Sequence, residues 1–309
     1  MGKYDSAWKD ILKAHFKDFI LFYFPHIAGS IDFTQPVQFL DKELAKLAPR
    51  NRSPGRLADL LVKVHSCTGK EQLLYCHVEV QGRKEPAFTV RLFQYAYRIY
   101  DRFKSFPVTL VVLTDSDPDF YPDAFEIINT GKYLRVEFQV AKLLYFKERV
   151  KQPKYRDNPF ACVTEVQLEV NELKGHRRRG MEKAEAEYKL KKKLVLRLYE
   201  SGYRSEYIQS LLLFLDWMVQ LPEELEGRLT DEITEERGGN KMSYVTSWER
   251  IGMKKGKQED LIRLLDKKFT LTEEEQEIIK NSMDVNKLNA AIDVILFAQT
   301  KEEVLKLLR

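Results

Sequence analysis

Two acidic residues lie on what the sequence predicts to be neighbouring β-strands. The runs 57–64 and 73–80 are rich in Leu and Val, and the polar stretch between them has the composition of a strand-reversing turn. A turn centred between the runs makes Asp59 and Glu79 direct neighbours, with their Cβ atoms roughly 5 Å apart. Carboxylates this close repel each other and are costly to bury, so the arrangement favours a cation between them.

The alternation of side chains along a strand separates two faces of this hairpin. One face is apolar, and the other carries Asp59, Leu61, Lys63, Tyr75, His77, Glu79 and Gln81. A hard cation such as Mg²⁺ is the simple partner for such acids, because it takes one or two carboxylates together with waters and substrate phosphate. Alternatively, the polar face is solvated and these are ordinary surface residues. The pattern alone leaves both interpretations open.

A wider resemblance adds to the first interpretation. Asp59, followed by Glu79-Val80-Gln81 at the end of the next strand and then by a helix, resembles the PD-(D/E)XK nuclease superfamily. More narrowly, the chain is similar to the recombination-promoting nuclease and putative transposase group. The segments similar to that group are YDSAWKDIL (4–12), FLDKEL (39–44), HVEVQ (77–81), RLFQYAYRIYDRF (91–103), LPEELE (221–226) and MSYVTSWERIG (242–252). The stretch from about residue 256 is similar to a small helical domain of unknown function that is often fused there.

The resemblance implies a function and a site. It implies a DNA endonuclease in which Asp59 and Glu79 bind Mg²⁺, or Mn²⁺ as a substitute, and the Val80 carbonyl adds a ligand. Gln81 stands where the superfamily has a lysine that contacts the attacking water or the phosphate. Glutamine can orient a water but carries no charge and cannot act as an acid or base near neutral pH. The alternative is therefore a catalytically inactive, nuclease-like module that binds DNA or protein.

Several further residues are candidates for supporting this site. Asp5 and Lys9 match an early Asp and Lys of the group, although the same pair can be a surface ion pair one helical turn apart. Glu43 is a second candidate for a supporting acid. Lys63 is either a displaced catalytic cation or a surface lysine.

The helix expected at about 87–103 contributes two more candidates. Arg91 and Tyr95 lie one turn apart on it, and in the resemblance this helix packs beside the catalytic strands. Arg91 is either a phosphate contact or a structural arginine that bridges helix and sheet.

The remaining elements must position these residues. Apolar spacing predicts a helix over 4–24 that ends at Pro25, and a helix over 158–170. The run 107–114 has the composition of a strand buried on both faces, and 31–40, 133–140 and 142–146 are expected to be extended. We therefore expect an α/β fold: a restriction-endonuclease-like mixed sheet flanked by helices over 1–172, a basic linker and helical region over 173–253, and a small helical domain over 254–309. Its cap candidates are Thr270, Thr272 and Thr300.

The composition of the chain limits the classes of protein to which it can belong. With 309 residues, 44% hydrophobic and 32% charged, the chain is expected to be globular, and its net charge of +4 permits nucleic-acid binding. Its 3 cysteines are too few and scattered for a disulfide framework or a zinc site. We expect a cytoplasmic protein without membrane segments. Its expected partners are DNA and a second copy of the chain, because nucleases that cut both strands commonly need two active sites.

Overall fold

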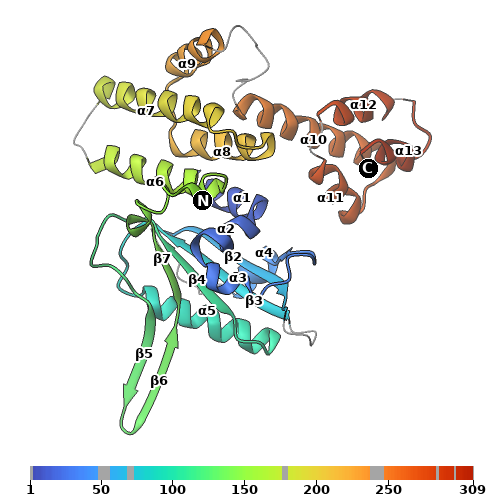
Figure 1. The fold of residues 1–309 in the computed structure, drawn as a ribbon. Coiled ribbons are helices and arrows are strands. Elements are labelled where there is room, and N and C mark those ends of the chain that lie inside the picture. The colour runs from blue at the N-terminus through green and yellow to red at the C-terminus, as the bar shows by residue number, and fades with distance from the viewer. Residues whose placement is uncertain are drawn as a thin grey trace. The chain divides into compact units, whose positions relative to one another are not determined.

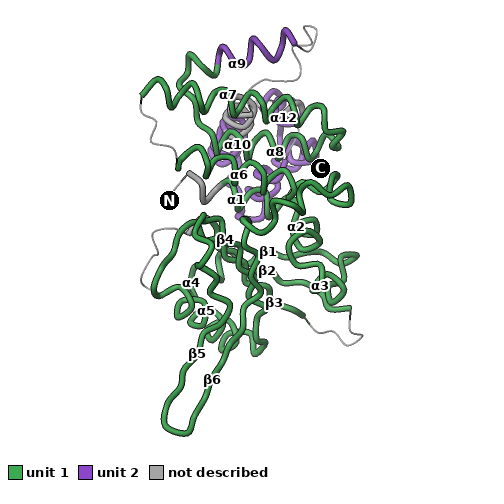
Figure 2. Tube along the Cα trace, turned by 60° about the vertical axis from the view of Figure 1, so that its left-hand side comes forward, with its two compact units in different colours: residues 1–226 green, residues 227–309 purple. Residues whose placement is uncertain are grey.

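The computed structural model describes residues 3–47, 56–67, 73–175, 180–236, 247–282, 285–295 and 297–308. Within these residues the fold is mixed α/β, which confirms the predicted class. A five-stranded mixed sheet and a smaller two-stranded sheet are flanked by helices, and helices follow to the C-terminus (Figure 1). The chain divides into two compact units, 1–226 and 227–309 (Figure 2). The boundaries expected at 172 and 253 stay predictions about domains.

The five-stranded sheet has the order β1-β2-β3-β4-β7. β2 pairs antiparallel with both β1 and β3, whereas β3, β4 and β7 run parallel. The strands are β1 (Gln38–Phe39), β2 (Arg56–His65), β3 (Leu73–Gln81), β4 (Val108–Leu113) and β7 (Gln139–Lys142). β4 is almost wholly buried, as its continuous Val and Leu composition predicts. The second sheet pairs β5 (Ala124–Asn129) with β6 (Lys132–Glu137).

Helices cover both faces of the five-stranded sheet (Figure 1). α5 (Phe88–Phe103) lies on one face, with α4 (Asp41–Leu47) beside it. α1 (Lys3–Ala14), α2 (Phe16–Tyr23) and α6 (Pro159–Gly175) lie on the other (Figures 1 and 2). Hydrogen bonds join this second group, since Trp8 Nε1 donates to Gln167 Oε1 over 3.0 Å and the Tyr23 and Thr164 hydroxyls are 2.7 Å apart. The core therefore has two layers, one on each side of the sheet.

Further helices complete the first unit. α3 (Pro25–Ala28), η1 (Leu143–Phe146) and η2 (Pro153–Tyr155) are short, and α7 (Gly180–Glu200) and α8 (Ser205–Met218) pack together and against α6. Trp8 of α1 packs edge-on against Phe214 of α8, with ring centroids 5.6 Å apart. The buried Lys191 of α7 is paired with Asp216 of α8 at 3.0 Å and with Glu226. The basic stretch after residue 173 thus contains a helix whose lysines include a structural, buried one.

Some predicted elements differ from the structure. The helix expected over 4–24 is two helices, because His15 leaves the helical conformation at φ −136° and packs its ring against Tyr207. The stop expected at Pro25 is confirmed, because α2 ends at Tyr23, and Pro25 then begins the short α3, where its fixed φ suits a first helical position. Of the extended segment expected at 31–40, only β1 and an isolated bridge at Ile31 form. The segment 142–146 is not a strand, because β7 ends at its first residue and η1 follows.

The second unit is helical in its described residues. α9 (Glu223–Glu236) spans the division between the units, and α10 (Ser247–Phe269), α11 (Glu273–Asn281), α12 (Val285–Ile295), α13 (Lys301–Leu305) and η3 (Lys306–Leu308) follow. Its core consists of Leu261, Leu265, Leu271, Ile279, Leu288, Ala291, Ile295, Ala298, Val304, Leu305 and Leu308. No helix in the described part of the chain is long and apolar enough to cross a bilayer.

Of the three predicted cap residues, only Thr272 forms a side-chain cap among the described contacts. Its hydroxyl accepts from the Glu275 backbone N–H, and the Glu275 carboxylate accepts from the Thr272 N–H, which is a capping box. Thr300 is an N-cap without such a bond, and Thr270 lies after α10 with φ 59°.

Thr272→Ala is expected to destabilise α11 by about 1 kcal/mol, because one N-terminal N–H loses its acceptor. Faster amide hydrogen exchange across α11 in the full chain measures this effect. Thr300→Ala is the matched control and is expected to change exchange little. Equal effects from both variants would contradict the assignment.

Candidate metal centre

β2 and β3 place the two predicted acids side by side. Asp59 and Glu79 are direct partners in the antiparallel ladder, and Lys63 opposes Tyr75, so the register expected from the sequence is confirmed. Both carboxylates project from the face covered by α5. Strand alternation adds His77 to the same face, two residues before Glu79.

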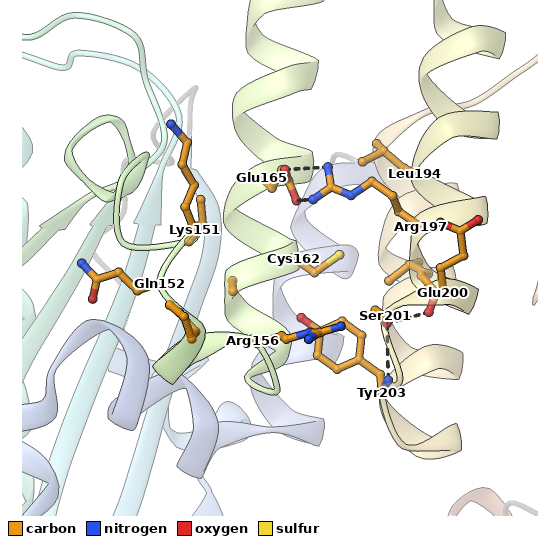
Figure 3. Close-up of a pocket in the computed structure, with 14 residues that line it drawn as sticks. Lys151, Gln152, Arg156, Cys162, Glu165, Leu194, Arg197, Glu200, Ser201 and Tyr203 are labelled. Atoms are coloured by element: carbon orange, nitrogen blue, oxygen red, sulfur yellow. Dashed lines mark hydrogen bonds and ion pairs between the residues drawn. The ribbon is translucent and has the colours of Figure 1, made fainter.

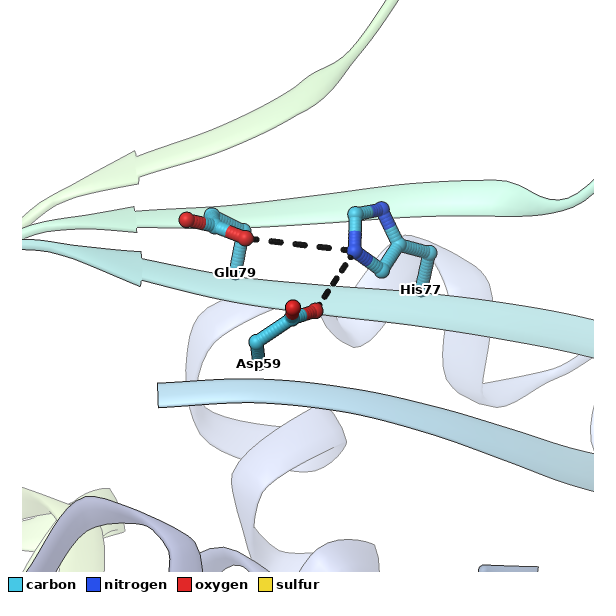
Figure 4. Close-up of side chains that lie close together, drawn as sticks. All are labelled: Asp59, His77 and Glu79. Atoms are coloured by element: carbon cyan, nitrogen blue, oxygen red, sulfur yellow. Dashed lines mark hydrogen bonds and ion pairs between the residues drawn. The ribbon is translucent and has the colours of Figure 1, made fainter. Parts of the chain in front are cut away.

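The three side chains converge (Figure 4). His77 Nε2 lies 2.9 Å from Asp59 Oδ1 and 3.9 Å from Glu79 Oε2. One potential ligand atom from each residue lies within 4.8 Å of the other two. The group therefore has the compactness that a single metal ion requires.

This polar group is inside the protein. Glu79 and His77 are 0% exposed and Asp59 is 7% exposed. Leu40, which lies just before α4, and apolar residues of α4, α5, β2 and β3 cover the neighbouring surface of the sheet. Those residues are Leu44, Leu61, Tyr75, Tyr95 and Ile99. The alternative interpretation, a solvated face with ordinary surface residues, is therefore wrong for Asp59, His77, Glu79 and Gln81, because α4 and α5 exclude solvent from them, whereas Lys63 is half-buried.

α5 supplies two hydrogen-bonding partners for the acids. Arg91 NH1 donates to Glu79 Oε1 over 2.6 Å, and the Tyr95 hydroxyl donates to Asp59 Oδ2 over 2.8 Å. Residues four apart lie on the same helical face, so one helix reaches both acids at once. The predicted packing of this helix beside the two strands is confirmed, and Arg91 bridges helix and sheet.

Three carboxylates belong to this cluster. Arg91 NH2 also donates to Glu85 Oε2 over 2.9 Å. Glu79 and Glu85 thus share the Arg91 guanidinium, and Asp59 is the direct ladder partner of Glu79. Glu79 Oε2 is buried and has no hydrogen-bond partner among the described residues. Burial, followed by repulsion from Asp59, raises the pKa of Glu79 to about 7, although Arg91 and His77 oppose this shift.

Gln81 is fully buried and its amide is already engaged. Its Oε1 accepts from Arg91 NH2 at 3.3 Å, and its Nε2 donates to the Arg83 carbonyl at 2.8 Å and to Glu85 Oε2 at 3.4 Å. Val80, the other predicted ligand, pairs with Val112 of β4, and its side chain lies on the opposite face of the sheet. Its carbonyl role stays a prediction.

The remaining candidates lie outside this group of contacts. The Asp5 side chain lies outside the described residues. Lys9, Glu43 and Lys63 make no hydrogen bond or ion pair with Asp59 or Glu79 in the described part of the chain. Lys63 is four residues from Asp59 along β2, roughly 13 Å between Cα atoms. Among the described residues, Arg91 is a cation that contacts Glu79.

The donor set fits a divalent cation. It offers two carboxylates and one imidazole, and Glu79 Oε2 is a buried acceptor that receives no hydrogen bond from the residues that the structure describes. A cation there would satisfy this oxygen and offset the negative charge. Sequence reasoning found the two acids but did not propose His77 or Glu85 as members of the group. The i, i+2 spacing of His77 and Glu79 was a usable signal for the first, whereas Glu85 follows the strand in a turn and gave none.

A cavity of about 420 Å³ elsewhere in the first unit offers no comparable chemistry (Figure 3). Arg197 in its wall forms two hydrogen bonds with the Glu165 carboxylate, at 2.7 and 2.8 Å, so its charge is compensated. Burial raises the pKa of the Cys162 thiol to about 12, which keeps it protonated and a poor nucleophile at neutral pH. None of the predicted site residues lines this cavity.

No protein-family model, curated protein or solved structure matches this chain. The resemblance to the PD-(D/E)XK superfamily therefore stays a prediction that depends on the residues quoted for it.

Proposed function

We propose that the chain is a divalent-metal-dependent DNA endonuclease that hydrolyses phosphodiester bonds, with Asp59 and Glu79 as metal ligands. The observation that carries this proposal is the buried pair of opposed carboxylates on adjacent strands, with the imidazole of His77 beside them. Two buried acids that lie this close repel each other, which raises the pKa of Glu79, and such perturbed groups concentrate at functional sites.

The residues around the acids have distinct roles in this proposal. When bound, the metal lowers the pKa of a water and offsets charge on the phosphate. Tyr95 orients Asp59, because its hydroxyl donates to one of the carboxylate oxygens. Arg91 holds Glu79 and Gln81 together, which places a fixed positive charge beside the position that has lysine in the superfamily. Gln81 would position the attacking water only if substrate binding frees its amide.

Further parts of the proposal depend on the resemblance and on charge. DNA as the substrate is consistent with the net charge of +4. A homodimer would supply two active sites for cutting both strands. A cytoplasmic location, Mg²⁺ or Mn²⁺ as the ion, and a link to recombination or mobile elements are proposed on the same basis.

The second candidate is a catalytically inactive module that binds DNA or protein. The ion pair between Arg91 and Glu79 favours it, because the guanidinium already occupies one oxygen of a proposed ligand. The low exposure of the acids also favours it. In this case Arg91 stabilises the fold instead of acting on a phosphate.

A time course of cleavage on supercoiled plasmid, with Mg²⁺, Mn²⁺ or EDTA, tests the proposal. Cleavage by the wild type is expected to depend on metal and to fall by roughly 10²-fold or more in Asp59→Asn and in Glu79→Gln, because each variant loses an anionic ligand. Asp101→Asn, at an exposed position of α5, is the control and is expected to cleave normally.

Two outcomes would contradict the endonuclease proposal. Cleavage that survives Asp59→Asn would remove the proposed site. No cleavage with any metal, from protein shown to be folded, would leave the binding module, and DNA affinity with a steep salt dependence would then support it.

A further inference from the structure

We propose that His77 is a third metal ligand through Nε2, so that the centre binds a first-row transition-metal ion in preference to Mg²⁺. This inference depends on the proposed metal site at Asp59 and Glu79. It replaces the all-oxygen site implied by the resemblance with a site of two carboxylates and one imidazole.

The position of Nε2 supports direct ligation. Metal–ligand bonds of roughly 2.1 Å place two neighbouring ligands of an octahedral ion about 3 Å apart. The separation of 2.9 Å between His77 Nε2 and Asp59 Oδ1 already matches this spacing. Glu79 Oε2, at 3.9 Å from Nε2, needs only a small inward movement. Figure 4 shows Nε2 directed toward both carboxylates.

The imidazole ring is held in this orientation by its surroundings. His77 is fully buried on β3, and its ring packs on that of Tyr95 with centroids 4.6 Å apart. Tyr95 in turn donates to Asp59. The ring therefore needs little reorganisation before it can bind an ion.

A competing role for His77 is that of a simple hydrogen-bond donor to Asp59. In that role a proton on Nε2 lies between the two residues, and a bound ion would use carboxylate oxygens only. Ligation instead replaces this proton by the ion. The two roles therefore differ in whether nitrogen is bonded to the metal.

The other ring nitrogen limits the expected affinity. Ligating histidines usually donate their second N–H to a carboxylate or carbonyl. His77 Nδ1 is buried and has no hydrogen-bond partner among the described residues. We therefore expect this site to bind a metal ion less tightly than a site in which Nδ1 has a hydrogen-bond acceptor. The site should still discriminate between ions. Imidazole suits ions such as Fe²⁺, Co²⁺ and Zn²⁺, whereas Mg²⁺ prefers oxygen.

Electron spin-echo envelope modulation of the full chain loaded with Mn²⁺ reports nitrogen bonded to the ion without any measurement of activity. The wild type is expected to show ¹⁴N modulation from one imidazole. His77→Gln is expected to lose this modulation, whereas the exposed His65→Gln control retains it. Calorimetric titration is expected to show that His77→Gln lowers Co²⁺ affinity by about tenfold or more, with a much smaller effect on Mg²⁺ affinity.

The outcomes separate this inference from the proposed function. Mn²⁺ binding that depends on Asp59 and Glu79 but shows no ¹⁴N modulation in the wild type would overturn the role of His77 and leave the carboxylate site intact. Absence of any saturable binding of Mn²⁺ or Co²⁺ to folded wild-type protein would overturn both. The wild-type spectrum decides the question even if His77→Gln does not fold.

Discussion

Arg91→Met is expected to lower the free energy of unfolding by about 3–5 kcal/mol at pH 8 in metal-free buffer, because it removes the cation from a buried ion pair. Arg91 is 5% exposed and donates to Glu79 and Glu85 at 2.6 and 2.9 Å. Methionine keeps most of the apolar stem, so the loss comes mainly from two carboxylates left without their guanidinium. Urea unfolding monitored by tryptophan fluorescence measures it.

The loss in Arg91→Met is expected to depend on pH and on metal. At pH 5 it should be smaller, because Glu79 then takes up a proton and no longer needs a positive partner. Mn²⁺ should stabilise the variant more than the wild type, because an ion can replace the guanidinium beside Glu79. Arg98→Met is the control from the same helix, since Arg98 donates to the Leu47 carbonyl. A loss that is the same at pH 5 and pH 8 would mean that Arg91 acts by packing.

Glu79→Gln is expected to gain stability relative to the wild type as pH rises, again without metal. Burial, followed by repulsion from Asp59, raises the pKa of Glu79 from 4.5 to about 7. A raised pKa in the folded state means that the contribution of this group to stability is full below about pH 4.5 and is lost as pH rises through 7. Glutamine cannot ionise and is free of this loss.

The difference in unfolding free energy between Glu79→Gln and wild type is expected to change by roughly 2–3 kcal/mol from pH 5 to pH 8, in favour of the variant. The comparison cancels the titration of groups that the two proteins share. The exposed Glu137→Gln serves as the control. A change below about 0.5 kcal/mol, or one of opposite sign, would show that Arg91 and His77 already compensate the charge.

The agreement between sequence and structure is closest at the hairpin. The period of two in β2 and β3, together with the polar stretch between them, predicts both the strands and the pairing of Asp59 with Glu79. A slip of one residue would turn the apolar set to the other face, so the pattern permits few registers. The buried strand β4 follows from an equally strong local pattern, and α6 lies where a helix was expected over 158–170.

The predicted elements agree less well with the structure where long-range packing overrides a local sequence pattern. The apolar spacing of 4–24 is compatible with one helix, yet His15 interrupts it and packs on Tyr207, a residue 192 positions away. β5 was not predicted, although its partner β6 was expected as an extended segment. A two-stranded ribbon with several exposed apolar residues lacks the clean alternation of a half-buried strand.

The sequence by itself determined the mixed α/β class, the opposed acid pair and the face that carries it, because these depend on strand period and turn spacing. Only the tertiary structure decided that this face is buried, that Arg91 and Tyr95 hold the two acids, and that His77 Nε2 lies between them. Which side chains are buried, and which contact each other, depends on how α5 packs across the sheet. This packing brings Arg91 to Glu79, 12 positions away, and Tyr95 to Asp59, 36 positions away. That packing turns two carboxylates into a charged, desolvated group that can select an ion.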